Sequence, residues 1–244
     1  MSLRPLGRLV LKRFRPRVQI ETSLWTNNNR TTAQLDRLVL TETHTLNRVE
    51  YVEVSHAGSQ AIGGQVGSIV LDGFPGGTLA VVNTTVENGL GNGLIEFASN
   101  TFGGLSEAPV RIVPDEVAKL DSSSTFLPSN ADNRVAIDEF GSVTADAVWP
   151  DPGVPYAVVD ELVVGAALTL SPGIEMQFDD SVRLRVNRDG AIIADASGGQ
   201  AIRFVGSTPL PGWWRGIQID SDDTANIMDN VEIRHAGEAS LSRE

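Results

Sequence analysis

The apolar positions of this chain fall in short runs of strand length that turn residues separate. The clearest runs lie between residues 156 and 233, where apolar and polar side chains alternate, as in Leu184-Arg185-Val186 and Ile202-Arg203-Phe204. Because side chains alternate across a strand, the outer residues of such a triplet point to one face and the middle residue to the other. The pattern therefore predicts short β-strands with an apolar inner face, and it places Arg185, Arg203 and Glu232 on the solvent side.

The predicted strands recur in groups of three. The first set lies at 162–164, 168–170 and 176–178, the second at 184–186, 191–193 and 202–204, and a third begins at 216–219 and 231–233. First members are 22 residues apart, second members 23 and third members 26. Turn residues such as Ser171-Pro172-Gly173 and Arg188-Asp189-Gly190 stand between them. Three short strands per coil predict an all-β fold, a parallel β-helix or β-solenoid in which each coil buries its apolar side on the next.

A long-range repeat supports this architecture. Val52-Glu53-Val54-Ser55-His56-Ala57-Gly58 returns as Val231-Glu232-Ile233-Arg234-His235-Ala236-Gly237, and 235 − 56 gives an offset of 179. On a solenoid, His56 and His235 then lie several coils apart and cannot share a metal ion. A corner residue encoded by the repeat is the favoured interpretation of both, ahead of a metal ligand or a catalytic base.

Four segments follow from the pattern. Residues 1–34 form a basic N-terminal segment, either a cap or part of a truncated coil, and residues 35–113 form β-helix coils with strands expected at 35–40, 49–54, 68–71, 79–82, 94–97 and 110–113. Residues 114–155 read as a loop-rich seam with one helical turn at 115–120, and residues 156–244 form coils that end in mid-unit. A coil that ends abruptly leaves a strand edge unpaired, so edge-to-edge self-association is expected there.

Composition narrows the function classes. The chain of 244 residues has no cysteine, which excludes disulfides and thiolate metal sites, and aromatic residues make up only 6%, so aliphatic residues must build the core. The net charge is −12, but residues 1–17 carry six basic residues and no acid, which leaves −18 for the rest. Such an acidic body is expected to repel nucleic acid and anionic lipid.

The sequence shows no pattern of a membrane helix or of a signal peptide. No apolar run reaches the roughly 18 residues of a membrane helix, and Leu9-Val10-Leu11 is too short for a signal peptide's apolar region.

The order of several motifs resembles a known class of protein. The motifs are Val154-Pro155-Tyr156, Leu168-Thr169-Leu170-Ser171-Pro172-Gly173, Gly190-Ala191-Ile192-Ile193-Ala194, Gly212-Trp213-Trp214-Arg215-Gly216-Ile217 and the closing 231–237. In this order they resemble the large repeat of bacterial secreted and cell-surface right-handed parallel β-helix proteins, which have the pectin-lyase-like fold. The resemblance covers residues 145–240 closely and 35–145 more loosely. It implies a right-handed solenoid located outside the cell or on its surface.

The resemblance carries two functional hypotheses. The first is a non-catalytic β-helix segment that acts as a structural spacer, an adhesion module or a scaffold that contacts a polysaccharide or cell-surface glycan. The alternative is a polysaccharide lyase or glycoside hydrolase, because the same fold hosts such enzymes. A polygalacturonase-like site would carry Gly-His-Gly and Arg-Ile-Lys, and neither occurs in this sequence. The motifs therefore favour a role that is not enzymatic, and we assign no catalytic residue.

Three clusters remain as binding candidates. Trp213 and Trp214 could stack on sugar rings, whereas the resemblance favours a structural reading in which one of them caps a corner of the core and the other is half exposed. Asp220, Asp222 and Asp223 could bind calcium, which takes several oxygen ligands, as could Asp179-Asp180. The same acids are the candidates for a glycosidase pair, which requires two carboxyl groups about 5–9.5 Å apart. Each acidic cluster also falls at a predicted turn, where aspartate is expected without any ligand.

Overall fold

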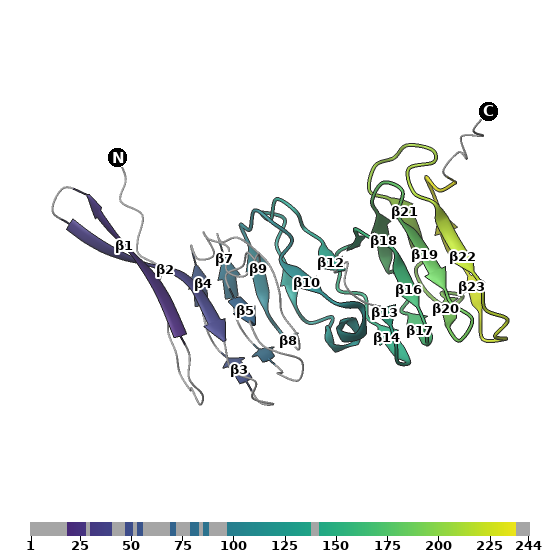
Figure 1. Ribbon diagram of the computed structural model, residues 1–244, viewed down its shortest axis with the longest axis horizontal. Helices are drawn as coiled ribbons and strands as arrows, with labels where there is room; N and C mark the ends of the chain where they lie inside the picture. Colours follow the sequence, from purple (N-terminus) through teal and green to yellow (C-terminus); the bar gives the residue numbers. More distant parts are fainter. Residues whose placement is uncertain are drawn as a thin grey trace. The chain divides into compact units, whose positions relative to one another are not determined.

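The computed structural model of the chain describes residues 19–27, 30–40, 47–50, 53–55, 69–71, 79–82, 85–87, 97–137 and 142–237, with side chains from residue 99 onward. The chain divides into two compact units. Unit 1 comprises Met1–Arg111 and Ser123–Asn133, and unit 2 comprises Ile112–Ser122 and Arg134–Glu244. Stacked parallel strands dominate both units, and the described residues contain almost no helix (Figure 1). The predicted all-β solenoid is therefore confirmed.

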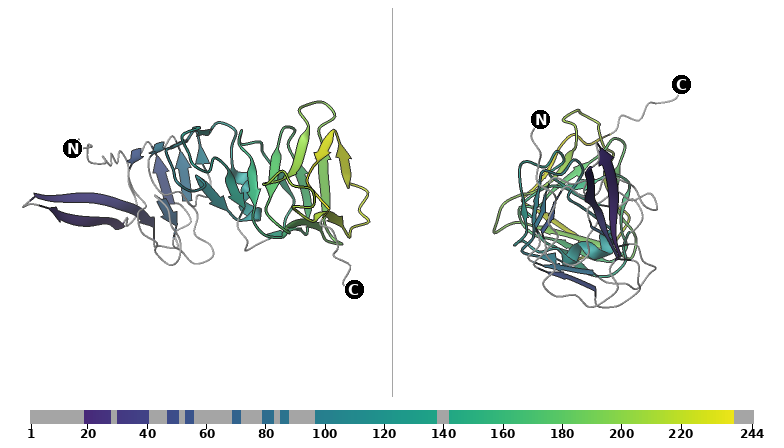
Figure 2. Two further views of the ribbon diagram at one scale, coloured as in Figure 1. Left: turned by 90° about the horizontal axis from the view of Figure 1, so that it is seen from above. Right: turned by 90° about the vertical axis from the view of Figure 1, so that its left-hand side faces the viewer.

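Unit 2 consists of three parallel sheets. The first contains β12 (Val135–Ile137), β15 (Tyr156–Val158), β18 (Glu175–Phe178), β21 (Ile202–Gly206) and β24 (Val231–Ile233). The second contains β13 (Ser142–Val143), β16 (Leu162–Val164), β19 (Arg183–Val186) and β22 (Gly216–Ile219). The third contains β14 (Ala147–Trp149), β17 (Ala167–Leu170), β20 (Ala191–Asp195) and β23 (Ile227–Asp229). Each strand pairs with the strand three positions later in the chain, so three strands make one coil of a solenoid of about four turns (Figure 2).

The strand registers test the spacings read from the sequence. Leu162 lies opposite Leu184, which confirms the offset of 22. Leu168 lies opposite Ile192 rather than Ala191, so the offset in that sheet is 24 and the prediction of 23 was wrong. A slip of one residue would turn Ile192, which is fully buried, to the outside. Met176 lies opposite Phe204, two residues beyond the predicted partner. This second error is milder, because a shift of two residues leaves every side chain on its predicted face.

Columns of aliphatic side chains fill the interior of unit 2. Val143, Val164 and Val186 are in register on adjacent strands, and all three are fully buried. An aromatic cluster lies on the first sheet, where the Phe178 and Phe204 rings are 6.4 Å apart between centroids and stacked. The alternation predicted for β19 is confirmed, because Leu184 and Val186 are buried whereas the Arg185 side chain is 39% exposed.

Unit 1 repeats the parallel arrangement. It begins with an antiparallel hairpin of β1 (Gln19–Asn27) and β2 (Arg30–Leu40), and β2 pairs in parallel with β5 (Ile69–Leu71). The other two sheets contain β3 (Asn47–Glu50), β6 (Leu79–Val82) and β8 (Phe97–Ala98), and β4 (Glu53–Ser55), β7 (Thr85–Glu87), β9 (Thr101–Gly103) and β11 (Thr125–Phe126). Phe102 and Phe126 lie opposite each other in register and stack with centroids 5.3 Å apart.

The range from 110 to 155 contains regular structure along with its loops. β10 (Val110–Ile112) spans the boundary between the units, and the 3₁₀ helix η1 (Pro114–Lys119) follows it. The helical turn predicted after Pro114 is therefore confirmed. In the range interpreted as a loop-rich seam, β11 to β14 contribute strands to both units.

The corners of the coil are set by backbone hydrogen bonds between adjacent turns. At the corner between β19 and β20, the Asn187 amide donates to the Val164 carbonyl at 2.8 Å, and the Gly190 amide donates to the Asn187 carbonyl at 2.9 Å. The chain approaches the previous coil so closely here that a Cβ added at Gly190 would lie 2.3 Å from the Val164 oxygen. This corner therefore requires a residue without a side chain.

We expect Gly190→Ala to destabilise the protein by about 1–3 kcal/mol, because the added methyl group can be accommodated only by moving backbone. Gly198→Ala is the matched control, since a Cβ at that corner would meet nothing within 4 Å. Urea denaturation followed by far-ultraviolet circular dichroism measures both variants. Equal midpoints for the two variants would show that the close approach at Gly190 does not exist.

Candidate functional site

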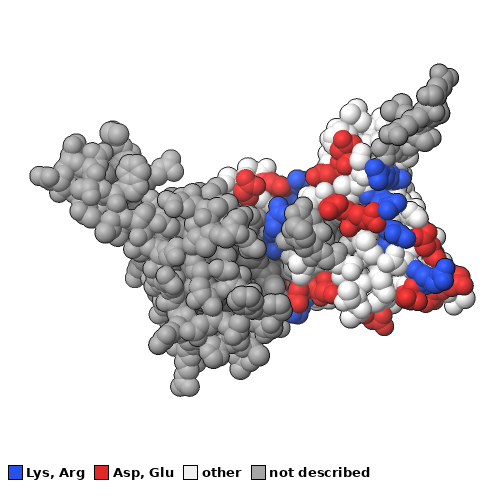
Figure 3. All heavy atoms as spheres, in the orientation of Figure 1, with Lys and Arg blue, Asp and Glu red and all other residues white. Residues whose placement is uncertain are grey.

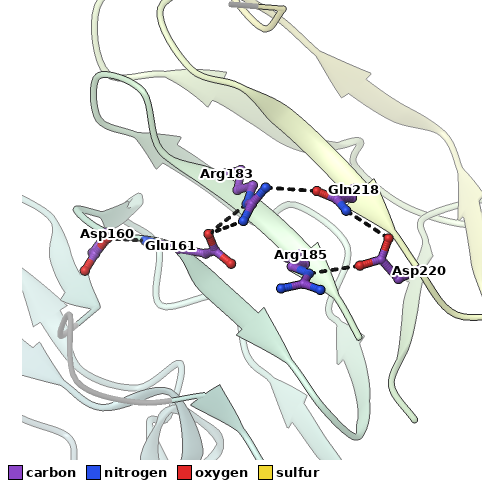
Figure 4. A network of polar contacts seen from close by, with 6 residues as sticks. All are labelled: Asp160, Glu161, Arg183, Arg185, Gln218 and Asp220. Carbon is purple, nitrogen blue, oxygen red and sulfur yellow. Dashed lines mark hydrogen bonds and ion pairs between the residues drawn. The ribbon is translucent and has the colours of Figure 1, made fainter. Parts of the chain in front are cut away.

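The outer face of the sheet β13-β16-β19-β22 carries a network of charged and amide side chains (Figure 4). Arg183 on β19 donates from Nε to Glu161 Oε2 at 2.7 Å and from Nη1 to Gln218 Oε1 at 3.0 Å. Gln218 in turn donates to Asp220 Oδ1 at 2.8 Å, and Arg185 Nε donates to Asp220 Oδ2 at 2.9 Å. These contacts join three successive coils, because Glu161 precedes β16 and Asp220 follows β22.

The network keeps Asp220 ionised. The hydrogen bond from Gln218 lowers the pKa of the Asp220 carboxyl most, and the hydrogen bond from Arg185 lowers this pKa further. A carboxyl group with a depressed pKa is a poor proton donor at neutral pH, whereas a general acid needs a raised pKa. Asp220 is therefore suited to holding Arg185 and poorly suited to protonating a leaving group.

The outer face of the sheet β12-β15-β18-β21-β24 is organised in the same way. Arg203 pairs with Glu175 across adjacent strands, with Arg203 Nη2 2.8 Å from Glu175 Oε2. Gln177 donates to the other oxygen of Glu175 at 2.7 Å, and Arg234 pairs with Glu232 at 3.1 Å. Figure 3 shows acidic and basic side chains next to one another over the described surface in that view. The outward charges named here are thus matched by partners on the same strand, on an adjacent strand or at an adjoining corner.

The two tryptophans occupy different environments. Trp214 is fully buried, its ring stacks on Phe178 with centroids 4.2 Å apart, and its Nε1 donates to the Arg234 carbonyl at 2.7 Å. Trp213 is half-buried on the loop between β21 and β22, where its Nε1 donates to Ser207 Oγ at 3.1 Å. Trp214 has no exposed face for a ligand in this structure. Trp213 alone remains a candidate for contact with a sugar, together with Leu210, which is 53% exposed on the same loop.

The acidic clusters lie at different corners of the coil. Asp220, Asp222 and Asp223 belong to the corner between β22 and β23, whereas Asp179 and Asp180 belong to the corner between β18 and β19. The structure does not bring the two clusters together into one facing pair of carboxyl groups.

The aspartates also make turn contacts of their own. Asp223 Oδ1 accepts a hydrogen bond from the Ala225 amide at 2.8 Å, which is an Asx-type turn. Within residues 97–137 and 142–237, no group of three His, Asp or Glu is arranged to hold a metal ion. Calcium binding by Asp220, Asp222 and Asp223 stays a prediction.

His235 lies at the corner after β24. Its backbone is left-handed, with a φ of 63°, and its carbonyl accepts a hydrogen bond from the Trp214 amide at 3.4 Å. Its Nδ1 is buried without a hydrogen-bond partner in the structure. The structure thus places this histidine at a turn of the repeat. Its counterpart His56 lies outside the described residues.

Sequence reasoning missed the asparagines that connect adjacent coils of unit 2. Asn226 Oδ1 accepts a hydrogen bond from the Ile192 amide at 2.9 Å, and Asn230 Nδ2 donates to the Ala196 carbonyl at 3.0 Å. Asn230 also has a positive φ of 53°, which asparagine tolerates better than most residues. The available signal was an asparagine on each side of β23. In unit 1, Asn100 likewise lies between two strands, β8 and β9, and its carbonyl accepts a hydrogen bond from the Thr125 amide at 2.7 Å.

Comparison of the chain with protein-family models, curated proteins and solved structures gave no match. No helix in the described part of the chain is long and apolar enough to cross a membrane. The functional argument therefore depends on the residues and their geometry.

Proposed function

We propose that this chain is a non-catalytic segment of a right-handed β-helix from a secreted or cell-surface bacterial protein, where it serves as a spacer and adhesion scaffold. The observation that carries the proposal is the pairing of outward charges between coils. Arg183, Arg185 and Arg203 each hold a carboxylate from another strand or corner, so these groups stabilise the stack of coils. The bacterial origin and the extracellular location come from the sequence resemblance alone.

The contact with a glycan is assigned to the loop between β21 and β22. Trp213 presents part of its ring there beside the exposed side chain of Leu210. The apolar face of a sugar ring packs well on an indole face, and the hydrogen bond from Trp213 Nε1 to Ser207 holds the ring in place. A loop at a corner of the solenoid is a suitable place for such a contact, since the stacked coils hold the loop in position while its own residues contact the ligand.

A glycan-array screen of the purified chain tests this function, with a lyase assay run on the same polysaccharides. We expect binding without turnover, and we expect Trp213→Ala to abolish the binding because the aromatic surface is lost. Leu210→Ala should weaken it, and Val148→Ala, which changes an exposed apolar residue on another sheet, should leave it intact. Running the screen with calcium and with a chelator tests the calcium prediction at the same time.

Turnover of any polysaccharide would contradict the proposal in favour of the lyase or hydrolase alternative. Binding that is unchanged in Trp213→Ala would place the glycan contact elsewhere. Absence of both binding and turnover would reduce the proposed function to that of a spacer.

A further inference from the structure

The loop that carries Trp213 is held between two described coils. On one side, the Ser181 amide donates to the Trp213 carbonyl at 2.9 Å, so the loop stacks on the corner between β18 and β19. On the other side, the Gly237 amide donates to the Trp214 carbonyl at 3.0 Å. Trp213 is therefore bordered by a coil before it and a coil after it, and the part of its side chain that remains exposed does not lie at an end of the stack.

The Trp213 ring lies against the end of β21. Its Nε1 donates to Ser207 Oγ at 3.1 Å, and a Cβ added at Gly206 would lie 2.9 Å from Trp213 Cδ1. Gly206 is in register with Phe178 one coil earlier, and the Ser207 amide donates to the Phe178 carbonyl at 2.8 Å. The residue one coil before Ser207 is therefore Asp179, the first residue of the corner on which the loop stacks.

The two acids of this corner, Asp179 and Asp180, have no arginine partner. Glu175 and Asp220, by contrast, each hold an arginine from another strand. In the part of the chain that the structure describes, neither Asp179 nor Asp180 forms an ion pair, and Asp180 Oδ1 accepts a hydrogen bond from Ser181 Oγ at 3.2 Å. These two carboxylates do not hold coils together through ion pairs, so they can bind a cation that a ligand brings.

An aromatic face next to unpaired carboxylates suits a cation attached to a ring with an apolar face. Tryptophan attracts cations more strongly than the other aromatic side chains, and a carboxylate accepts charge-assisted hydrogen bonds from an ammonium group. A hexosamine with a free amino group offers both an ammonium group and a sugar ring that packs on an indole. A uronic acid would instead bring a carboxylate toward two carboxylates, and like charges at an interface are unfavourable.

We propose that the Trp213 site is specific for glycans with free amino groups, such as polymers of unacetylated hexosamine. Trp213 supplies the surface on which a sugar ring stacks, and Asp179 and Asp180 bind the ammonium groups. This inference rests on the proposed glycan contact and adds the charge of the ligand to it. The net charge of −12 also favours the approach of a cationic glycan, although it does not select a site.

Isothermal titration calorimetry of the full chain with a short glucosamine oligomer tests the proposal, in a buffer that keeps the amines protonated. The N-acetylated oligomer of the same length is the matched ligand, because acetylation removes the charge and keeps the sugar rings. We expect the free amine form to bind about tenfold more tightly or better. The difference should shrink in about 1 M salt, where the Debye length falls to about 3 Å. A uronic acid oligomer should not bind.

Paired variants locate the charge that selects the ligand. Asp179→Asn with Asp180→Asn should weaken binding of the free amine oligomer by about tenfold, to the affinity of the N-acetylated form, because the amides keep the shape but lose the charge. Asp222→Asn with Asp223→Asn removes the same charge from the corner between β22 and β23 and should leave the affinity unchanged. Trp213→Ala should abolish binding of both oligomers.

The outcomes distinguish this inference from the proposed function. Glycan binding that requires Trp213 but does not discriminate free from acetylated amines would overturn the inference and leave the proposed function intact. Equal weakening by the two double variants would indicate attraction to the acidic surface as a whole, and it would overturn the assignment to Asp179 and Asp180. Absence of binding to any glycan would overturn both the inference and the proposed glycan contact.

Discussion

Val186→Asp is expected to unfold unit 2. The Val186 side chain is fully buried on β19, and its neighbours in register are Val164 and Ile219. An aspartate at this position would place a carboxylate in an aliphatic column, and an unpaired buried charge costs several kcal/mol. Because small domains are stable by only about 5–15 kcal/mol, this is a large share of the free energy of unfolding. Circular dichroism during thermal and urea denaturation measures the loss.

Two controls distinguish the inner face from the outer. Val148→Asp makes the same chemical change at a residue that is 59% exposed on β14, and it should alter the free energy of unfolding by about 0.5 kcal/mol or less. Arg185→Ala removes the outward neighbour of Val186 and its ion pair with Asp220, for which an exposed pair allows at most about 1 kcal/mol. Similar losses in Val186→Asp and Val148→Asp would contradict the assignment of faces.

The sequence predicted the faces of a strand well wherever polar residues interrupt the apolar ones. Arg185 between Leu184 and Val186 leaves one arrangement that buries both aliphatic side chains, and the structure adopts it. The run Ala191-Ile192-Ile193 is apolar throughout, so its pattern is equally compatible with either face. That ambiguity explains the error of one residue in the register of β17 and β20. The contact between Leu168 and Ile192, which decides the face, is tertiary and has no local signature.

The polar network was predictable only in part. Alternation placed Arg185 and Arg203 on the outside, but it could not identify their partners. Arg185 lies 35 residues from Asp220, and Arg183 lies 22 residues from Glu161. These pairs depend on which strands become neighbours and on the length of each corner. Both properties arise from stacking of the coils, so the sequence pattern of a single strand cannot predict the partners.

The environments of the adjacent tryptophans could also be predicted only in part. The sequence predicted that one of Trp213 and Trp214 could belong to the core and the other to the surface, without deciding which. Trp214 is the inner one because Phe178, from the previous coil, offers a parallel ring, and the Arg234 carbonyl, at the corner after β24, accepts its Nε1 hydrogen. Both partners are far away in the chain, so tertiary contacts decide which of the two rings is buried.

Trp214→Ala is expected to destabilise unit 2 by about 3–5 kcal/mol. The substitution would remove a fully buried indole, the ring contact with Phe178 and the hydrogen bond to the Arg234 carbonyl, and it would leave a cavity at the corner where the last coil begins. Far-ultraviolet circular dichroism is the suitable probe, because the substitution itself changes the tryptophan fluorescence.

Two further variants separate the contributions of this side chain. Trp214→Phe keeps a ring against Phe178 but leaves the Arg234 carbonyl without its donor, so its cost should be smaller, about 1–3 kcal/mol from the lost hydrogen bond. Trp213→Ala removes a half-buried ring that donates only to Ser207, and it should cost least of the three. Because Trp213→Ala is expected to remain folded, a loss of glycan binding in this variant can be attributed to the missing ring and not to unfolding. A Trp213→Ala variant as unstable as Trp214→Ala would mean that both rings support the core, and the sugar contact would then have to be assigned to other residues.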